Sequence, residues 1–251
     1  MTATGPGADV GRPPAARSAS DAIPVPPSLA ADGVEGYALG QTVALTKADR
    51  SYQQIRRRII EGQLEAGMPL DQEAIALELQ LSTTPVREAL NRLESEGLVV
   101  YRAHRRTVVA PLTMGALQEI YAVRVALDPL AAGLAAAAAS EEEIARIVAI
   151  GSRPAEQEPV DALHGNRRLH RAIYASCGNA VLIRILDSLW DRSDRYRLMT
   201  LHAEGTIALA HDEHLAIALA IRDRNADRAT ELMRHHVASS FDRIREAEFD
   251  A

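Results

Sequence analysis

The chain has 251 residues, of which 47% are hydrophobic and 25% charged, so it is long enough for more than one hydrophobic core. Its formal net charge of -6 at pH 7 excludes a uniformly basic nucleic-acid-binding protein. The single cysteine, Cys177, excludes an internal disulfide, and no apolar run approaches the roughly 20 residues that span a bilayer. We therefore expect a cytoplasmic protein with two domains.

Residues 1–46 are rich in Pro, Gly, Ala and Ser and lack the charged-then-apolar pattern of a secretion signal, which predicts a disordered tail. Charge is distributed unevenly along the rest of the chain. Residues 47–110 carry a net charge of +1 and residues 111–251 a net charge of -5. Because the arginines of the middle segment are clustered, this segment can present a basic face although the whole protein is acidic.

The middle segment reads as three short helices. Apolar residues recur at helical spacing from Ser51 to Gln63, and two glycines and a proline then break the pattern. A second short helix starts at Asp71. The stretch LSTTPVREALNRLESEGLVV, from Leu81 to Val100, predicts a third helix that Gly97 ends.

Both ends of this third helix carry local signals. The hydroxyl groups of Ser82, Thr83 and Thr84 can accept hydrogen bonds from the first backbone amides, and Pro85 suits the first turn. After the helix, VVYRAHRRTVVAP has two β-branched runs around a basic tip, which predicts a hairpin.

Three helices followed by a basic-tipped hairpin are typical of a winged helix-turn-helix. In such a domain the third helix binds DNA: its free amides lie against phosphates and Arg87 reaches a guanine edge or a phosphate. The alternative is a small helical domain whose arginines are merely solvated. The predicted DNA-binding residues are Arg56, Ser82, Thr83, Thr84, Arg87, Arg92, His104, Arg105 and Arg106.

The second half of the chain shows no strand alternation and many alanines, which predicts an all-α bundle. Ser140 and Glu143 form a capping-box pattern at the start of one of its helices. The predicted helices are Met114 to Ala139, Glu141 to Ile150, Val160 to Ser176, Ala180 to Leu201, Ile207 to Arg222 and Ala226 to Glu248.

Three histidines lie on the apolar faces of three of these helices: His170, His214 and His236. Asn166 precedes the first by four residues and therefore shares its stripe. A single histidine of this kind is usually a satisfied core residue, whereas three together with an amide oxygen suit zinc, nickel or a related ion. His211 is a substitute ligand, and His235 should point away from the site.

Arg124 falls on the apolar stripe of the first bundle helix. A guanidinium that faces the interior needs an anion. One interpretation is a structural pair with Asp128, four residues on. The other is a clamp for the carboxylate of an effector next to the metal.

The segment PVREALNRLESEGLV, preceded by IIEGQLEAGMPLDQEAIALELQLS, closely resembles the DNA-binding domain of GntR-type bacterial transcription regulators over about 60 residues. The family commonly has glycine at position 80 and arginine at position 83, where this chain has Gln80 and Thr83. It also has an asparagine-arginine-glycine wing tip where His104, Arg105 and Arg106 stand. These departures affect the operator sequence that we can expect.

The second half resembles the FCD domain of FadR-type regulators, in its smaller, VanR-like version with six helices. The resemblance implies a divalent metal, zinc or nickel, held by His170, His214 and His236, with Asn166 where the family usually has aspartate. It also implies an organic-acid effector beside the metal. The effector-binding residues that it implies are Arg124, Asn166, His170, His214 and His236.

The sequence thus predicts a mainly α, dimeric regulator with a winged helix-turn-helix over residues 47–111 and an effector-binding and dimerisation domain over residues 112–251. It should bind double-stranded operator DNA and release it when a small carboxylate binds. A metal-dependent enzyme is a rival from another class, since an open metal site can activate water, but no carboxylate shares the histidine stripes. A direct sensor of the metal is the third reading.

Overall fold

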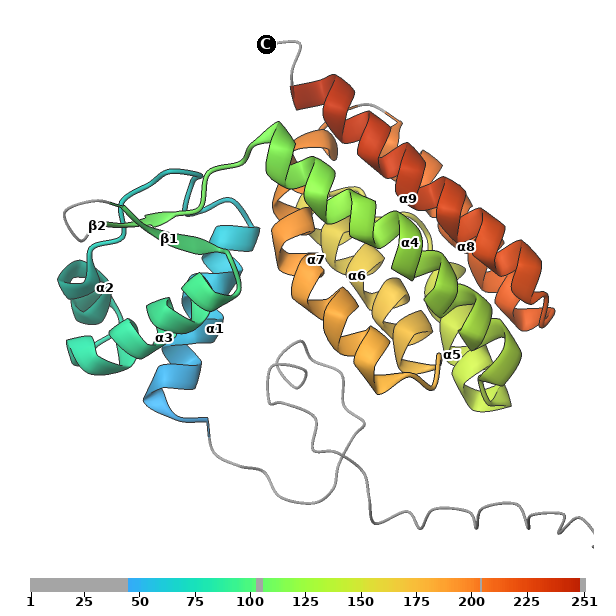
Figure 1. The fold of residues 1–251 in the computed structure, drawn as a ribbon, viewed down its shortest axis with the longest axis horizontal. Coiled ribbons are helices and arrows are strands. Elements are labelled where there is room, and N and C mark those ends of the chain that lie inside the picture. The colour runs from blue at the N-terminus through green and yellow to red at the C-terminus, as the bar shows by residue number, and fades with distance from the viewer. Residues whose placement is uncertain (1–44, 103–105, 204, 249–251) are drawn as a thin grey trace, which may run out of the picture. The chain divides into compact units, whose positions relative to one another are not determined.

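The computed structural model describes residues 45–102, 106–203 and 205–248. The predicted tail lies outside these residues except for its last two positions, and so do His104 and Arg105 of the predicted wing tip. The described chain is mainly helical, with a winged helix-turn-helix followed by an all-α bundle, which confirms the predicted fold class (Figure 1).

The winged-helix part contains three helices and a hairpin. Their bounds are α1 Lys47–Ile60, α2 Gln72–Glu78, α3 Thr83–Ser95, β1 Val99–Arg102 and β2 Arg106–Val109. The strands pair antiparallel with Val99 opposite Val109. Leu90, Leu93 and Leu98 are fully buried in the core beneath them.

Capping explains where these helices begin. Thr46 and Asp49 form a capping box, which starts α1 four residues before the apolar periodicity predicts. The Asp71 side chain accepts from two backbone amides at the start of α2. Ser82 stands at the N-cap of α3, but its side chain makes no capping hydrogen bond, contrary to our expectation. The first amides of α3 are thus not capped by Ser82.

Six helices form the bundle, close to the predicted bounds: α4 Met114–Ala138, α5 Glu141–Gly151, α6 Pro159–Ala175, α7 Ala180–Thr200, α8 Thr206–Arg222 and α9 Ala226–Glu248. The capping box of Ser140 and Glu143 is present at the start of α5. α4 and α9 run side by side (Figure 1). Gly133 allows this close approach, because a Cβ there would lie 2.4 Å from the Thr230 hydroxyl oxygen.

Among the described residues, α4 is long and apolar enough to cross a membrane by length and composition, with a mean hydropathy of 1.4. The expectation that no apolar run approaches this length was therefore wrong. Half of the most apolar part of α4 is buried inside the protein, and the helix carries a buried ion pair. We interpret α4 as a core helix of the bundle.

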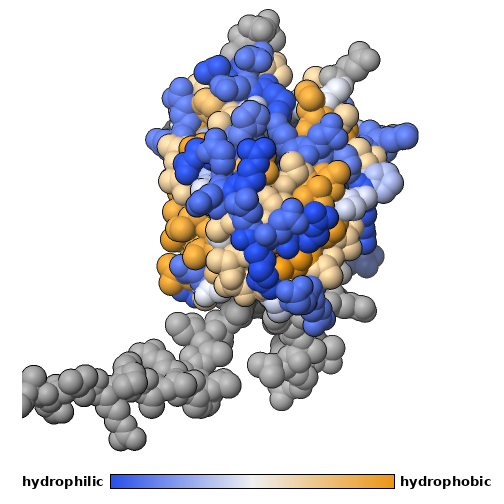
Figure 2. Space-filling view, turned by 90° about the vertical axis from the view of Figure 1, so that its right-hand side faces the viewer, coloured by the Kyte–Doolittle hydropathy of each residue, from blue (hydrophilic) through white to orange (hydrophobic). Residues whose placement is uncertain are grey.

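On the side that lies at the right of Figure 1, hydrophilic residues cover much of the surface and separate its apolar patches (Figure 2).

Candidate metal centre and nucleic-acid interface

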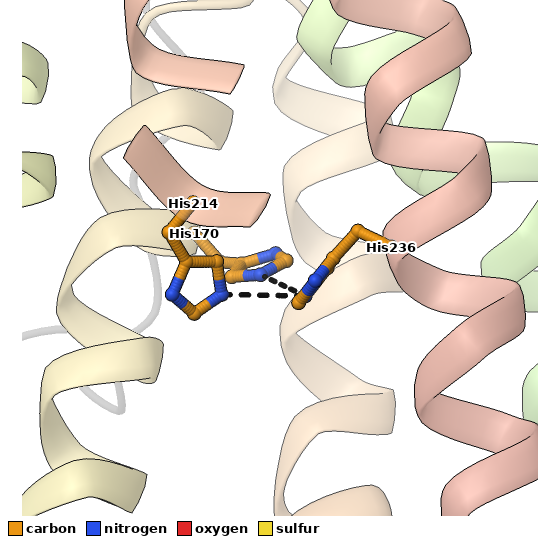
Figure 3. A group of neighbouring side chains, drawn as sticks. All are labelled: His170, His214 and His236. Atoms are coloured by element: carbon orange, nitrogen blue, oxygen red, sulfur yellow. Dashed lines mark hydrogen bonds between the residues drawn. The ribbon is translucent and has the colours of Figure 1, made fainter. Parts of the chain in front are cut away.

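Three helices bring the predicted histidines together: α6 supplies His170, α8 His214 and α9 His236 (Figure 3). The Nε2 atom of His236 lies 3.2 Å from Nε2 of His170 and 3.3 Å from Nε2 of His214. Nitrogen ligands bound at about 2.0–2.1 Å to one ion lie about 3.0–3.4 Å apart. Two of the three pairs therefore have the spacing of ligands around a single ion, and all three ligand atoms lie within 4.8 Å of one another.

Burial keeps these imidazoles neutral. It lowers the pKa of His170 and of His214 well below the usual value, and the neighbouring His236 adds to both effects. Burial also lowers the pKa of His236 to about 4, although Glu213 acts in the opposite direction. A neutral imidazole offers a lone pair, so no proton has to be displaced from these rings at physiological pH before a metal binds.

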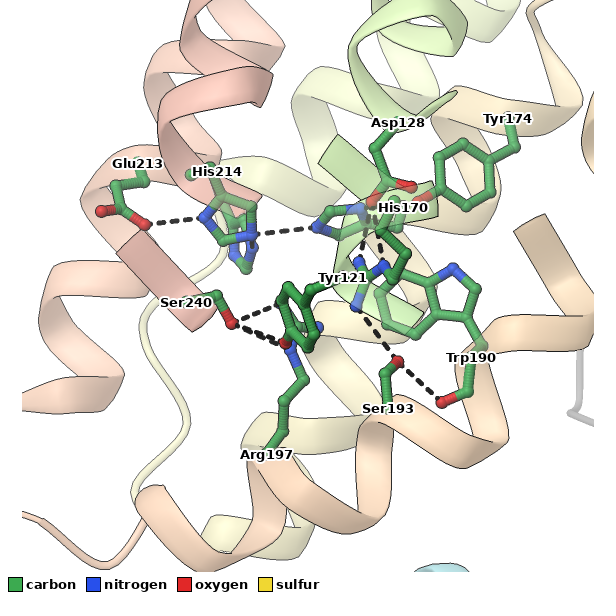
Figure 4. Close-up of polar contacts among 12 residues, drawn as sticks. Tyr121, Asp128, His170, Tyr174, Trp190, Ser193, Arg197, Glu213, His214 and Ser240 are labelled. Carbon is green, nitrogen blue, oxygen red and sulfur yellow. Dashed lines mark hydrogen bonds and ion pairs between the residues drawn. The ribbon is translucent and has the colours of Figure 1, made fainter. Parts of the chain in front are cut away.

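The other ring nitrogens orient two of the histidines. Nδ1 of His236 lies 2.7 Å from Oε2 of Glu213, and Nδ1 of His170 lies 3.1 Å from the Tyr174 hydroxyl (Figure 4). A carboxylate accepts, so Nδ1 of His236 carries the proton and its Nε2 presents a lone pair toward the other two rings. Carboxylate-histidine contacts of this kind are the usual support of metal sites.

The sequence reasoning did not find Glu213, because it looked for carboxylates on the histidine stripes. Glu213 precedes His214 but contacts His236 on another helix. Burial acts to raise the pKa of Glu213, but hydrogen bonds from His236 and Arg243 outweigh it and hold the pKa at about 2. The carboxylate is thus ionised and engaged with both partners, so it is not a free general base.

A cavity of about 90 Å³ lies beside the cluster, and His214, His236 and Asn166 line it. Asn166 is half-buried, and its Nδ2 has no hydrogen-bond partner among the described residues. An amide that needs a partner and faces this cavity suits a ligand that reaches the cluster. His211 also lines the cavity but does not belong to the three-histidine group, and His235 is exposed, as predicted.

Arg124 does not line this cavity. Its side chain is fully buried, donates to Oδ2 of Asp128 at 2.8 Å and to the Ser193 hydroxyl at 3.1 Å, and lies 4.6 Å from the centre of the Trp190 ring. Both groups of the Arg124–Asp128 pair have no solvent exposure. Of the two interpretations of Arg124, the contacts favour the structural pair over the effector clamp. The carboxylate that the guanidinium needs is supplied by Asp128, one helical turn away.

Arg197 on α7 is the guanidinium that lines the cavity, and the sequence reasoning missed it. It is 6% exposed, and it interacts electrostatically with Asp194, one turn earlier on α7. Its Nε and Nη2 each lie 3.4 Å from the Ser240 hydroxyl oxygen, and its Nη1 has no hydrogen-bond partner there (Figure 4). Helical spacing could have predicted this position, because Arg197 follows the apolar Trp190 by seven residues, or two helical turns, and so lies on the same face of α7.

The beginning of α3 gathers part of the predicted DNA-binding set. Ser82, Thr83, Thr84 and Arg87 are all exposed there. His104 and Arg105 lie outside the described residues, and Arg106 belongs to β2, without a description of its side chain. The exposed hydroxyl groups and Arg87 leave this end of the helix open to a phosphate backbone.

Two other arginines of that set are engaged inside the protein. Arg56 pairs with Asp191 of α7, and its side chain is 14% exposed. Arg92 pairs with Asp49 and Glu96, and its guanidinium lies 3.7 Å from the centre of the Tyr52 ring. Each of them has an acidic partner that the helical pattern did not reveal.

A winged helix-turn-helix joined to a helical domain with a ligand-sized cavity defines a DNA-binding transcription regulator. The comparisons with known proteins agree: residues 47–109 match the bacterial regulatory proteins of the gntR family, and residues 119–239 match the FCD domain. The chain is 30% identical to the uncharacterised HTH-type transcriptional regulator BphR of Paraburkholderia xenovorans, over 88% of this chain and 96% of BphR. The protein belongs to the GntR family and carries an FCD domain.

Other relatives support the same class. The HTH-type transcriptional repressor GlaR of Escherichia coli is 27% identical over 82% of this chain and 98% of GlaR. The structure of E. coli McbR/YncC has the same fold, with a TM-score of 0.69 at 19% identity over 80% of this chain and 98% of that one. A GntR regulator structure from Rhodococcus gives 0.67 at 20% identity, over 81% and 99%. The two structures share the fold, whereas the family and the curated relatives are transcriptional regulators, so the chain is a transcription regulator and not an enzyme.

Proposed function

We propose that the protein is a homodimeric repressor that binds operator DNA through residues 47–111 and releases it when a small carboxylate binds in residues 112–251. The observation that carries this proposal is the convergence of three neutral imidazoles, two of which, His214 and His236, line a cavity. GntR regulators bind operator DNA and FCD domains bind small-molecule effectors. The name of GlaR, a repressor, favours repression.

His170, His214 and His236 would hold a divalent ion, zinc or nickel, with the Asn166 amide oxygen as a further ligand. Imidazole nitrogen is the donor that these ions share. The donor set fits because each ring is neutral and two of them are oriented through Nδ1. When bound, the ion supplies a positive charge that can hold a carboxylate oxygen. Direct sensing of the metal is the second candidate, since the same histidines would serve it.

Arg197 would bind the effector carboxylate in place of Arg124. A buried guanidinium nitrogen without a hydrogen-bond partner is costly, as Nη1 of Arg197 is among the described residues, and a carboxylate can accept two hydrogen bonds from a guanidinium. Arg197, His214 and His236 line the same cavity, so one small acid can contact all three.

The N-terminal end of α3 would contact the operator. Thr83 and Thr84 suit phosphate contacts, and Arg87 suits a base edge in the major groove. The symmetry of a homodimer predicts an inverted repeat with one half-site for each recognition helix. A second copy could cover the exposed apolar residues of α4 and α7. These include Val123 and Leu130 on α4 and Val181 and Ile185 on α7.

The metal is tested by calorimetric titration of zinc and of nickel into the full chain. The effector clamp is tested by the thermal shift that acetate, succinate or citrate gives to the zinc-loaded protein. We expect Arg197→Gln to bind zinc but to lose this shift. Arg168→Gln is the matched control, because Arg168 lines the same cavity but already pairs with Glu156 at 3.2 Å. A wild-type chain that binds neither metal would overturn the proposed site.

A further inference from the structure

Asp191 on α7 is held by two arginines that come from different domains. Arg56 of α1 donates from Nη2 to Oδ1 at 2.6 Å and from Nε to Oδ2. Arg167 of α6 donates from Nη2 to the same Oδ1. All three side chains are largely buried, at 14%, 10% and 12% exposure for Arg56, Arg167 and Asp191. One carboxylate oxygen is thus shared between the DNA-binding domain and the bundle.

The electrostatics make this cluster sensitive to the position of each member. Burial acts to raise the pKa of Asp191, but the charges of Arg167 and Arg56 outweigh it and lower the pKa. Nε of Arg167 also lies 3.4 Å from Oδ2 of Asp194. Basic and acidic side chains therefore alternate along the cluster, in the order Arg56 of α1, Asp191 of α7, Arg167 of α6 and Asp194 of α7. In a poorly solvated place, losing one partner leaves another charge uncompensated.

The same two bundle helices carry part of the metal and effector site: His170 and Asn166 on α6 and Arg197 on α7. On α6, Arg167 directly follows Asn166 and precedes His170 by three residues, so a rigid helix moves all three together. On α7, Asp191 directly follows Trp190. The Trp190 ring centre lies 4.8 Å from that of His170 and 5.2 Å from the Arg197 guanidinium. The shared carboxylate therefore follows, in the chain, a residue whose ring lies close to both His170 and Arg197.

We infer that the Arg56–Asp191 pair, through its competition with Arg167 for Oδ1, couples the metal and effector site to the DNA-binding domain. This inference rests on the proposed function of that site. A ligand that shifts α6 changes how strongly Arg167 holds Oδ1, and so changes the free energy of the pair with Arg56. The metal and effector site and the DNA-binding domain then both change the stability of the same ion pair, which is the physical requirement for coupling.

Other contacts reach the winged helix, but they are less suited to this role. Arg195 donates to the Ala110 carbonyl, and the Tyr196 hydroxyl bonds to the backbone of Thr113 at 3.0 Å, so both hold the linker rather than α1. His164 lies 3.7 Å from Glu61 and is 42% exposed, which makes a weak pair. The cluster around Asp191 is a buried contact that joins α6 and α7 to the middle of α1.

Coupling is reciprocal, so a change in α1 must alter metal affinity even without DNA. We expect Arg56→Gln to change the dissociation constant for zinc about fivefold or more, as measured by calorimetry on the full chain. The control is Arg58→Gln, because Arg58 lies on the same helix but pairs with Glu78 within the winged-helix domain. It should stay within about twofold of wild type. Arg56→Lys keeps the charge but loses the two-point contact, so it should fall between them and serves if Arg56→Gln does not fold.

Hydrogen exchange with and without zinc gives the second readout. Zinc should change exchange in residues 47–60 of the wild type and of Arg58→Gln, but not of Arg56→Gln. Trp190, the only tryptophan of the chain, reports zinc binding by its fluorescence in each variant. If Arg56→Gln binds zinc like the wild type and keeps the change in α1, the coupling role is refuted and the metal site stands. If the wild type binds no zinc, the site and the coupling fail together.

Discussion

The start of α3 and the three-histidine cavity are built in opposite ways. The predicted DNA contacts from Ser82 to Arg87 are neighbours in sequence and are exposed, so solvent satisfies their polar groups. The histidines come from three helices, the first and the last being 66 positions apart in the chain, and are buried. A buried polar group must find its partner by tertiary packing. Single substitutions should therefore be costly for stability in the second region and should act mainly on binding in the first.

The largest effect should come from breaking the buried pair of Arg124 and Asp128. We expect Asp128→Ala to lower the free energy of unfolding by about 3–5 kcal/mol, because it leaves a fully buried guanidinium without its carboxylate. Denaturant unfolding followed by circular dichroism measures the loss. Asp242→Ala is the control, because it removes an exposed ion pair with Arg245 on α9 of the same bundle. It should lower the free energy of unfolding by less than about 1 kcal/mol. Equal losses in the two variants would contradict the structural role of Arg124.

This contrast also explains what the sequence could predict. Periodicity and capping placed the helices within a few residues, since both are local signals; α1 began earlier only because its capping box, Thr46 and Asp49, precedes the apolar pattern. Three histidine stripes predicted the cluster, because each stripe lies on the apolar face of its helix, and the apolar faces meet in the core of the bundle. What periodicity does not encode is the partner of a side chain on another helix.

The arginines show this limit most clearly. Arg56 lies between the apolar positions of α1 and reads as a surface residue, but Asp191, 135 residues away, buries it. Arg197 lies on a buried stripe, but the cavity that it lines is formed by helices that meet only in the folded bundle. The sequence pattern did not predict the role of Glu213 for the same reason, since Glu213 lies on α8 and its partner His236 lies on α9.

A smaller effect, confined to binding, should follow from Arg87→Ala. Arg87 is exposed on α3, so its removal should leave the free energy of unfolding within about 0.5 kcal/mol. Specific operator affinity should fall by roughly 1–3 kcal/mol. Gel-shift titration against DNA upstream of its own gene, with random DNA at the same salt, measures this loss. Arg92→Ala should instead lower stability, because Arg92 stacks on Tyr52 inside the domain. Wild-type affinity no better than that for random DNA would refute the interface.

The smallest expected effect concerns Asn166, where this chain departs from the aspartate that its family resemblance implies. Neutral imidazoles and an amide leave the charge of a divalent ion uncancelled in a poorly solvated place, whereas aspartate would cancel part of it. We expect Asn166→Asp to bind zinc about tenfold more tightly, on the order of 1.4 kcal/mol. Calorimetric titration of zinc into both proteins measures the difference.

The uncancelled charge should also make the metal and an anionic effector bind cooperatively, each raising the affinity of the other by the same factor. Asn166→Asp should weaken this cooperativity, because the added carboxylate repels the effector. Repeating the zinc titration with and without saturating citrate tests it. Asn179→Asp adds the same charge at the N-cap of α7 and should leave zinc affinity unchanged. If Asn166→Asp also leaves it unchanged, Asn166 does not bind the metal, and its unpartnered Nδ2 must be satisfied by another ligand of the cavity.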